Sequence, residues 1–134
     1  MKSLFTVSII IFCQFVFAQQ KDSLLSYPIA VKFQSICCGV PDGTPLRRMV
    51  LSFKKKNRLK YIASYHIGPL GREGEYIVGF PLDEMTQKQK KNFIKKIKII
   101  VPKLNDKGQS AFEEPFSVST QNLPSNLSIE RIDF

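Results

Sequence analysis

Apolar and polar residues alternate along three segments of the chain, and a period of two is typical of β-strands. Residues 29–36 place β-branched and aromatic side chains at every second position. Residues 59–67 and 75–82 alternate in the same way, and the glycine-rich stretch 68–74 joins them. We therefore predict one strand followed, later in the chain, by a β-hairpin.

Two other segments carry apolar residues at the spacing of one helix face. The first follows Thr44 and Pro45, where we expect the Thr44 hydroxyl to cap the free N–H groups of the first turn. The second follows Thr86-Gln-Lys-Gln89, which predicts a capping box, and Pro102 ends it. Both helices should pack one face against a sheet.

The order strand, helix, strand, strand, helix indicates an α+β, ferredoxin-like split β-α-β sandwich, with two helices on one face of an antiparallel sheet. We expect a fourth strand in the tail, residues 108–134, where 116–120 and 127–134 both qualify, or else a hairpin formed by the tail itself. The buried phases of these elements predict a core of Val31, Phe33, Met49, Val50, Phe53, Tyr61, Ala63, Val78, Phe80, Phe93, Ile94 and Ile97.

Residues 1–18 have the pattern of a secretory signal peptide. Lys2 precedes an apolar run, and Val16-Phe17-Ala18 places small residues at a cleavage site. We expect cleavage after Ala18 and a secreted or periplasmic protein that keeps no transmembrane segment. Residues 19–134 are long enough for a single domain with its own core.

The chain is strongly basic, with a formal net charge of +9 from 20 basic and 11 acidic residues. Cleavage would remove only Lys2, and 19 − 11 leaves +8. Residues 45–60 and 86–103 contain no acid. Such a charge attracts an anionic envelope polymer or an acidic protein partner, and export argues against nucleic acid; alternatively, the lysines only solvate the helices. The expected basic surface comprises Arg47, Arg48, Lys54, Lys55, Lys91 and Lys95.

Cys37 and Cys38 are adjacent and are the only cysteines left after cleavage. In the split plan the first two strands run parallel, so their ends meet at one edge of the sheet. That edge would collect the cysteine pair, His66, the 68–74 loop with Arg72 and Glu73, and the helix start at Thr44. A helix N-terminus lowers a thiol's pKa and attracts anions, so we expect acidic thiols there.

Three interpretations of the cysteine pair remain open. Both thiolates, with His66, can hold Cu(I) or Zn(II). The pair can instead form a strained vicinal disulfide that acts as a redox switch, or it can be buried as small apolar residues. In topology the metal site resembles heavy-metal-associated domains, which bind metal between the first strand and first helix. Those domains use Met-x-Cys-x-x-Cys, whereas Cys37 and Cys38 are adjacent here.

The predicted hairpin loop places Arg72 between Gly71 and Glu73. This arrangement can bind a ligand's carboxylate or phosphate, or form an internal Arg–Glu pair. No Ser, Cys or paired-acid constellation joins the single histidine, which alternation places on a strand surface. We therefore expect an exported binding module with a metal or redox rim at Cys37 and Cys38, or else a basic interaction protein; the sequence favours a binding role over catalysis and leaves the question of an enzyme open.

Overall fold

The structure is a computed structural model that describes residues 23–105 and 108–134; the predicted signal peptide lies outside these residues. The strands are β1 (Leu24–Tyr27), β2 (Ile29–Ser35), β3 (Ala63–Gly68), β4 (Tyr76–Phe80), β5 (Gly108–Glu113), β6 (Phe116–Ser119) and β7 (Ser128–Asp133). The helices are α1 (Thr44–Asn57) and α2 (Gln87–Ile100), with short 3₁₀ turns η1 (Val101–Leu104) and η2 (Thr120–Asn122). None of the helices described is long and apolar enough to span a membrane.

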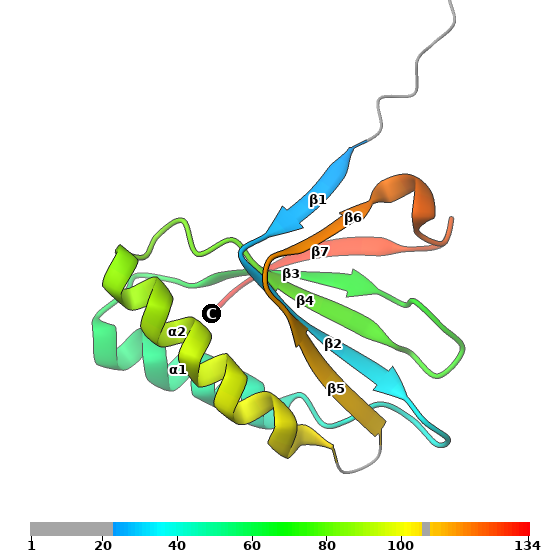
Figure 1. Ribbon diagram of the computed structural model, residues 1–134, viewed down its shortest axis with the longest axis horizontal. Coiled ribbons are helices and arrows are strands. Elements are labelled where there is room, and N and C mark those ends of the chain that lie inside the picture. The colour runs from blue at the N-terminus through cyan, green and yellow to red at the C-terminus, as the bar shows by residue number, and fades with distance from the viewer. Residues whose placement is uncertain (1–22, 106–107) are drawn as a thin grey trace, which may run out of the picture.

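Five strands form one antiparallel sheet in the order β5-β2-β4-β3-β7. Both β2 and β3 pair antiparallel with β4, so they run parallel to each other, as the split plan requires. Helices α1 and α2 lie side by side on one face of this sheet (Figure 1). The predicted α+β class, with two helices on one face of an antiparallel sheet, is confirmed.

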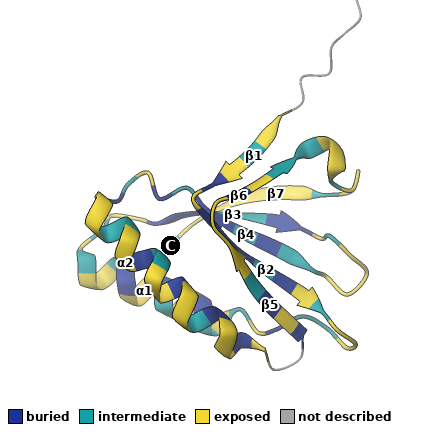
Figure 2. Ribbon diagram, viewed as in Figure 1, coloured by how far each residue is buried: buried dark blue, intermediate teal, exposed yellow. Residues whose placement is uncertain are grey.

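The main core lies between the helices and the sheet. Phe53 of α1 and Phe80 of β4 both meet the ring of Phe93 edge-on, at centroid distances of 5.1 and 5.2 Å. Figure 2 shows both helices buried toward the sheet and exposed on the outside. The predicted core is correct for Val31, Phe33, Val50, Phe53, Ala63, Phe80, Phe93 and Ile97, while Met49, Val78 and Ile94 are half-buried.

The opposite face of the sheet is covered by a separate pair of strands, of which the sequence analysis predicted only the segment of β6. β1 pairs antiparallel with β6 as a separate two-stranded ribbon. Tyr27 of β1 stacks on Tyr65 and on Phe116, with ring centroids 5.5 and 6.2 Å apart. These rings pack with Ala30 and Ile67 into a smaller core. Residues 24–27, for which the sequence analysis predicted no strand, therefore form one.

The burial of both sheet faces explains one error in the sequence analysis. The predicted apolar phase of β3 includes Tyr65 and Ile67, but both belong to the core under the ribbon. The helix-facing positions are Ser64 and His66, and Tyr61 is 38% exposed outside the strand. Tyr61 is thus wrong as a core residue, because the alternation described the other face.

The strand beside β2 at the edge of the sheet is β5, which neither predicted tail segment contains. β5 pairs with β2, whereas β6 joins the ribbon and β7 lies beside β3 at the far edge of the sheet. Both predicted tail segments, 116–120 and 127–134, do contain strands, but neither of them lies beside β2. Residues 109–113 contain no β-branched side chain and only one aromatic one, so the sequence indicates a strand only weakly. The strand forms where this segment packs against η1 and β2.

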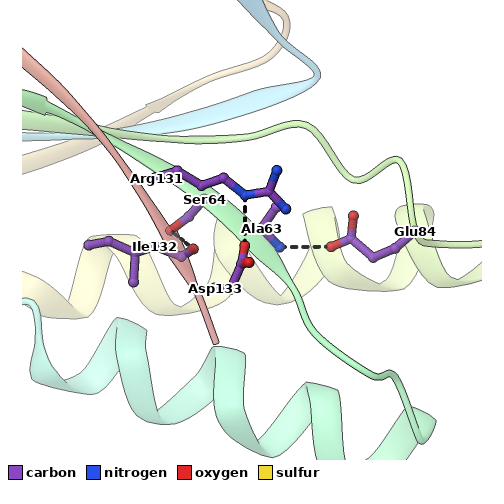
Figure 3. A network of polar contacts seen from close by, with 6 residues as sticks. All are labelled: Ala63, Ser64, Glu84, Arg131, Ile132 and Asp133. Atoms are coloured by element: carbon purple, nitrogen blue, oxygen red, sulfur yellow. Dashed lines mark hydrogen bonds and ion pairs between the residues drawn. The ribbon is translucent and has the colours of Figure 1, made fainter.

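Side-chain contacts attach β7 and the loop before α2 to β3 (Figure 3). The Ser64 hydroxyl donates to the backbone carbonyl of Ile132 at 3.1 Å. Ala63 donates its backbone N–H to Glu84 Oε1 at 3.0 Å, and within β7 itself Arg131 Nε pairs with Asp133 Oδ1 at 3.0 Å. The C-terminal strand is therefore fixed to the sheet by side chains as well as by its ladder.

Candidate functional site

The cysteine pair lies in the loop between β2 and α1. Both thiols are exposed, so the interpretation of Cys37 and Cys38 as core residues is wrong. A hydrogen bond between the two thiols, together with slight desolvation and the negative charge of Glu73, raises the pKa of Cys37. The expectation of an acidic thiol is therefore wrong for Cys37, because its neighbours favour the protonated form.

The helix N-terminus near this loop is already occupied by a carboxylate. α1 begins at Thr44, but Gly43 is its N-cap residue and provides no side-chain cap. Instead, Asp42 Oδ1 accepts the backbone N–H of Thr44 at 2.8 Å. Thr44 as the capping residue is thus wrong, and the Asp42 charge offsets the positive end of the helix dipole that was expected to stabilise a thiolate.

His66 lies in a stack of rings that crosses three strands on the helix-facing side of the sheet. Its ring centroid is 4.6 Å from that of Tyr76, which in turn lies 4.5 Å from that of Phe33. Burial, together with the charge of Asp42, raises the pKa of Tyr76. The stack lines an apolar pocket of about 180 Å³ that also includes Leu46 and the C-terminal Phe134.

The structure brings the cysteine loop toward the hairpin loop but does not assemble a ligand set around it. Glu73 acts electrostatically on Cys37, as expected for loops at one edge of the sheet. Across residues 23–105 and 108–134, no group of three or more His, Cys, Asp or Glu side chains is placed to hold a metal ion. Within the described residues, therefore, Cys37, Cys38 and His66 do not form a ready-made set of three metal ligands.

Arg72 and Glu73 are both exposed in the β3–β4 loop. Arg72 lines a shallow pocket together with Leu70 and residues of the 124–126 turn. No other charged side chain among the described residues lines this pocket. The three ion pairs found among the described residues do not include an Arg72–Glu73 pair. Arg72 is thus available to an anion, although the loop presents only this one cation.

The outer surface of the helices is far more strongly charged. α1 and α2 contain five and six basic residues and no acidic one. The predicted members Arg47, Arg48, Lys55, Lys91 and Lys95 are exposed, and Lys54 is half-buried. Among the ion pairs found in the described residues, only that between Lys98 and Glu114 involves a helix lysine.

A groove of about 270 Å³ runs between the helices near the end of α1. Lys56 of α1 faces Lys95 and Lys96 of α2 across it, and Asn92 adds an amide. Phe53 and Ile99 provide the apolar part of the lining. We refer to this feature as the lysine groove. Its residues Lys56, Lys96 and Asn92 were missing from the predicted surface, although the two acid-free runs in the sequence contain them.

The comparisons with known proteins add no family to this picture. Searches against family models, curated proteins and solved structures found no match to the chain.

Proposed function

We propose that this protein is an exported binding module whose helix layer binds an anionic polymer of the cell envelope. The observation that carries the proposal is the lysine groove, where three lysines line one cleft between two helices that contain no acid. Like charges held together on adjacent helices repel one another, and a polyanion relieves that repulsion. The predicted signal peptide supports an envelope location.

A linear polymer fits the groove better than a single small anion does. The basic side chains extend along both helices, from Arg47 in α1 to Lys98 in α2. A chain of regularly spaced phosphate or carboxylate groups can contact several of them at once. Each exposed contact is worth only about 0.2–1 kcal/mol, so affinity has to come from their number. Such binding weakens as salt screens the charges.

The test is titration of the mature protein with inorganic polyphosphate at several salt concentrations. The variant Lys95→Gln/Lys96→Gln removes two charges from the lysine groove. We expect its affinity to fall by roughly 2–30-fold, from two contacts of about 0.2–1 kcal/mol each. The matched control Arg72→Gln/Arg131→Gln removes two charges from the sheet edge and its loop. Equal losses in both variants, or binding insensitive to salt, would contradict the proposal.

The exposed cysteine pair supports a second proposal, a thiol-redox function. Cys37 and Cys38 are both accessible and are adjacent in the chain. Oxidation would join the two sulfurs, release two protons and transfer two electrons to a disulfide-bearing partner, which becomes two thiols. The raised pKa of Cys37 means that this exchange speeds up as the pH rises.

Intact mass after incubation with oxidised glutathione tests this function. Loss of two hydrogens, reversed by a reductant, is the expected result, and the Cys38→Ser variant should instead retain a glutathione adduct on Cys37. The redox proposal fails if the wild-type mass stays unchanged. The same incubation with Cu(I) or Zn(II), followed by native mass measurement, examines whether the two thiols bind a soft metal.

A further inference from the structure

We infer that a second ligand site lies on the other face of the sheet, in a pocket that receives a small organic cation at Glu75. The pocket has a volume of about 330 Å³ and lies where β2 ends and β4 begins. Its walls include Lys32 and Gln34 from β2, Ile77 from β4, and Leu70 and Gly71 from the hairpin loop. This volume falls at the small end of known ligand pockets, which span about 300–1,000 Å³.

Glu75, a half-buried residue, lines this pocket, and one of its two carboxylate oxygens has no partner within the described part of the protein. Glu75 Oε2 is buried and has no hydrogen-bond partner among the described residues. The carboxylate lies against the backbone of Gly71, so closely that a side chain at that position would collide with it. A buried, unpaired carboxylate oxygen is costly, because burial removes the water that would otherwise solvate its charge.

The single cationic side chain among the described residues lining this pocket does not compensate Glu75. Lys32 Nζ donates to Glu113 Oε1 at 2.8 Å and lies 5.7 Å from the centroid of the Phe116 ring. Its charge is thus directed toward β5 and the ribbon. The pocket keeps one carboxylate with an unused acceptor, which is suited to a donor that carries positive charge.

The loop that holds Glu75 has a defined conformation. Leu70 donates its backbone N–H to the carbonyl of Glu75 at 2.7 Å, which closes the loop at its base. Gly74 adopts a positive φ of 80°, where a residue with a side chain would be strained. Leu70 and Ile77 supply apolar surface beside the carboxylate. The ligand class is therefore a short aliphatic chain that ends in an ammonium or guanidinium group.

This site is independent of the proposed polyanion surface. Lys32 contacts the ribbon side of the sheet, whereas the lysine groove lies between the helices on the other side. The ligands also have opposite charge. A protein that binds polyphosphate but no cation, or the reverse, would separate the two proposals.

The test uses agmatine, which carries an ammonium and a guanidinium group on a four-carbon chain, and ¹⁵N-labelled mature protein. We expect agmatine to shift the backbone amide signals of Leu70, Gly71 and Ile77, while neutral 1,4-butanediol leaves them in place. The Glu75→Gln variant keeps the shape of the side chain and removes its charge. It should bind agmatine about 10–100-fold more weakly, as expected for loss of a hydrogen bond to a charged group.

Glu73→Gln is the matched control, because it removes an exposed carboxylate from the same loop and should change agmatine affinity by no more than about twofold. The inference is overturned if agmatine shifts no amide around the pocket, if butanediol shifts the same amides, or if Glu75→Gln binds as the wild type does. Should Glu75→Gln not fold, the amide map of the wild-type protein alone still decides the matter.

Discussion

The helices and the β1–β6 ribbon cover opposite faces of one sheet with very different amounts of apolar side chain. Among the residues that the structure describes, fourteen buried ones form the core under the helices, whereas five form the core under the ribbon. Burying one large apolar side chain stabilises a fold by about 1.5–3 kcal/mol. The helix layer therefore supplies most of the stability, and the ribbon depends on a few aromatic contacts.

The two layers also differ in charge. Eleven basic residues lie in α1 and α2, while β1 and β6 contain no charged residue at all. A helix with a period of 3.6 can bury one stripe and keep the rest of its circumference charged. The exposed positions of the ribbon strands, Leu24, Ser26 and Ser117, are uncharged. The helix layer can therefore carry many charges and still bury its core, and this is the layer that we propose binds a polyanion.

The largest effect should come from removing one large aromatic side chain from each layer. Phe53→Ala removes a ring that is 2% exposed and should cost about 3–5 kcal/mol of unfolding free energy. Phe116→Ala, at the same exposure, should cost no more than about 3 kcal/mol, because the ribbon can open locally while the sheet stays folded.

Chemical denaturation of both variants gives the two costs, and amide hydrogen exchange locates the loss. In Phe116→Ala, exchange should quicken at Leu25 and Val118 of the ribbon but not at Val31 of the sheet. Leu51→Ala, at a position 42% exposed on α1, is the control and should stay within about 0.5 kcal/mol. Equal costs for the two phenylalanines would mean that ribbon and helices unfold as one unit.

The next effect concerns how closely the ribbon approaches the sheet. The ring of Tyr27 lies directly over Gly79, so a methyl group there would collide with it. Gly79→Ala should cost about 1–3 kcal/mol, the usual range for overpacking. In a Tyr27→Ala background the same change should cost much less, since the ring is gone. A double-mutant cycle measured by denaturation gives this coupling; additive costs would place Tyr27 away from Gly79.

Sequence alone predicted the helices better than the strands, for a physical reason. The capping box at the start of α2 was predicted correctly, because Thr86 and Gln89 satisfy each other's N–H groups within four residues. β3 was assigned the wrong buried phase, because both of its faces are covered. β5 was missed, since its pairing with β2 depends on residues more than seventy positions away.

For the candidate site, the sequence predicted which loops lie close together but not how their side chains interact. Strand directions correctly placed the loop of Cys37 near the loop of Glu73. The capping role of Asp42 was missed, although an acid just before a helix is a recognised cap, because Thr44 offered a second cap in the same turn. The unpaired oxygen of Glu75 has no signature in sequence, because burial of one atom depends on the folded loop.

A smaller effect compares the first turns of the two helices. Thr86→Ala removes the hydroxyl that accepts the N–H of Gln89 at 3.3 Å and should cost about 1 kcal/mol. Thr44→Ala should stay within about 0.5 kcal/mol, because Asp42 and not Thr44 accepts the N–H of that turn. Denaturant midpoints at a constant slope measure both changes, and the reverse order of costs would restore Thr44 as the cap of α1.

The smallest effect is the pH dependence of two tyrosines, one under each layer. Burial raises the pKa of Tyr27 and of Tyr76 above the ordinary value of 10.0; the second cause is Tyr65 for the former and Asp42 for the latter. Since the unfolded chain loses these protons first, their contribution to stability is fully present below pH 10.0 and is lost as the pH rises through the folded pKa.

The Asp42→Asn variant separates the two tyrosines. Asparagine can still accept the N–H of Thr44, but it no longer places a negative charge near Tyr76. Carbon-13 signals of labelled tyrosine rings, followed against pH, should show a lower pKa for Tyr76 and an unchanged pKa for Tyr27. Because Tyr27 lies under the ribbon on the other face, it serves as the control within the same molecule. Equal shifts in both tyrosines would mean that the variant has altered the fold and that Asp42 does not act on Tyr76 through its charge.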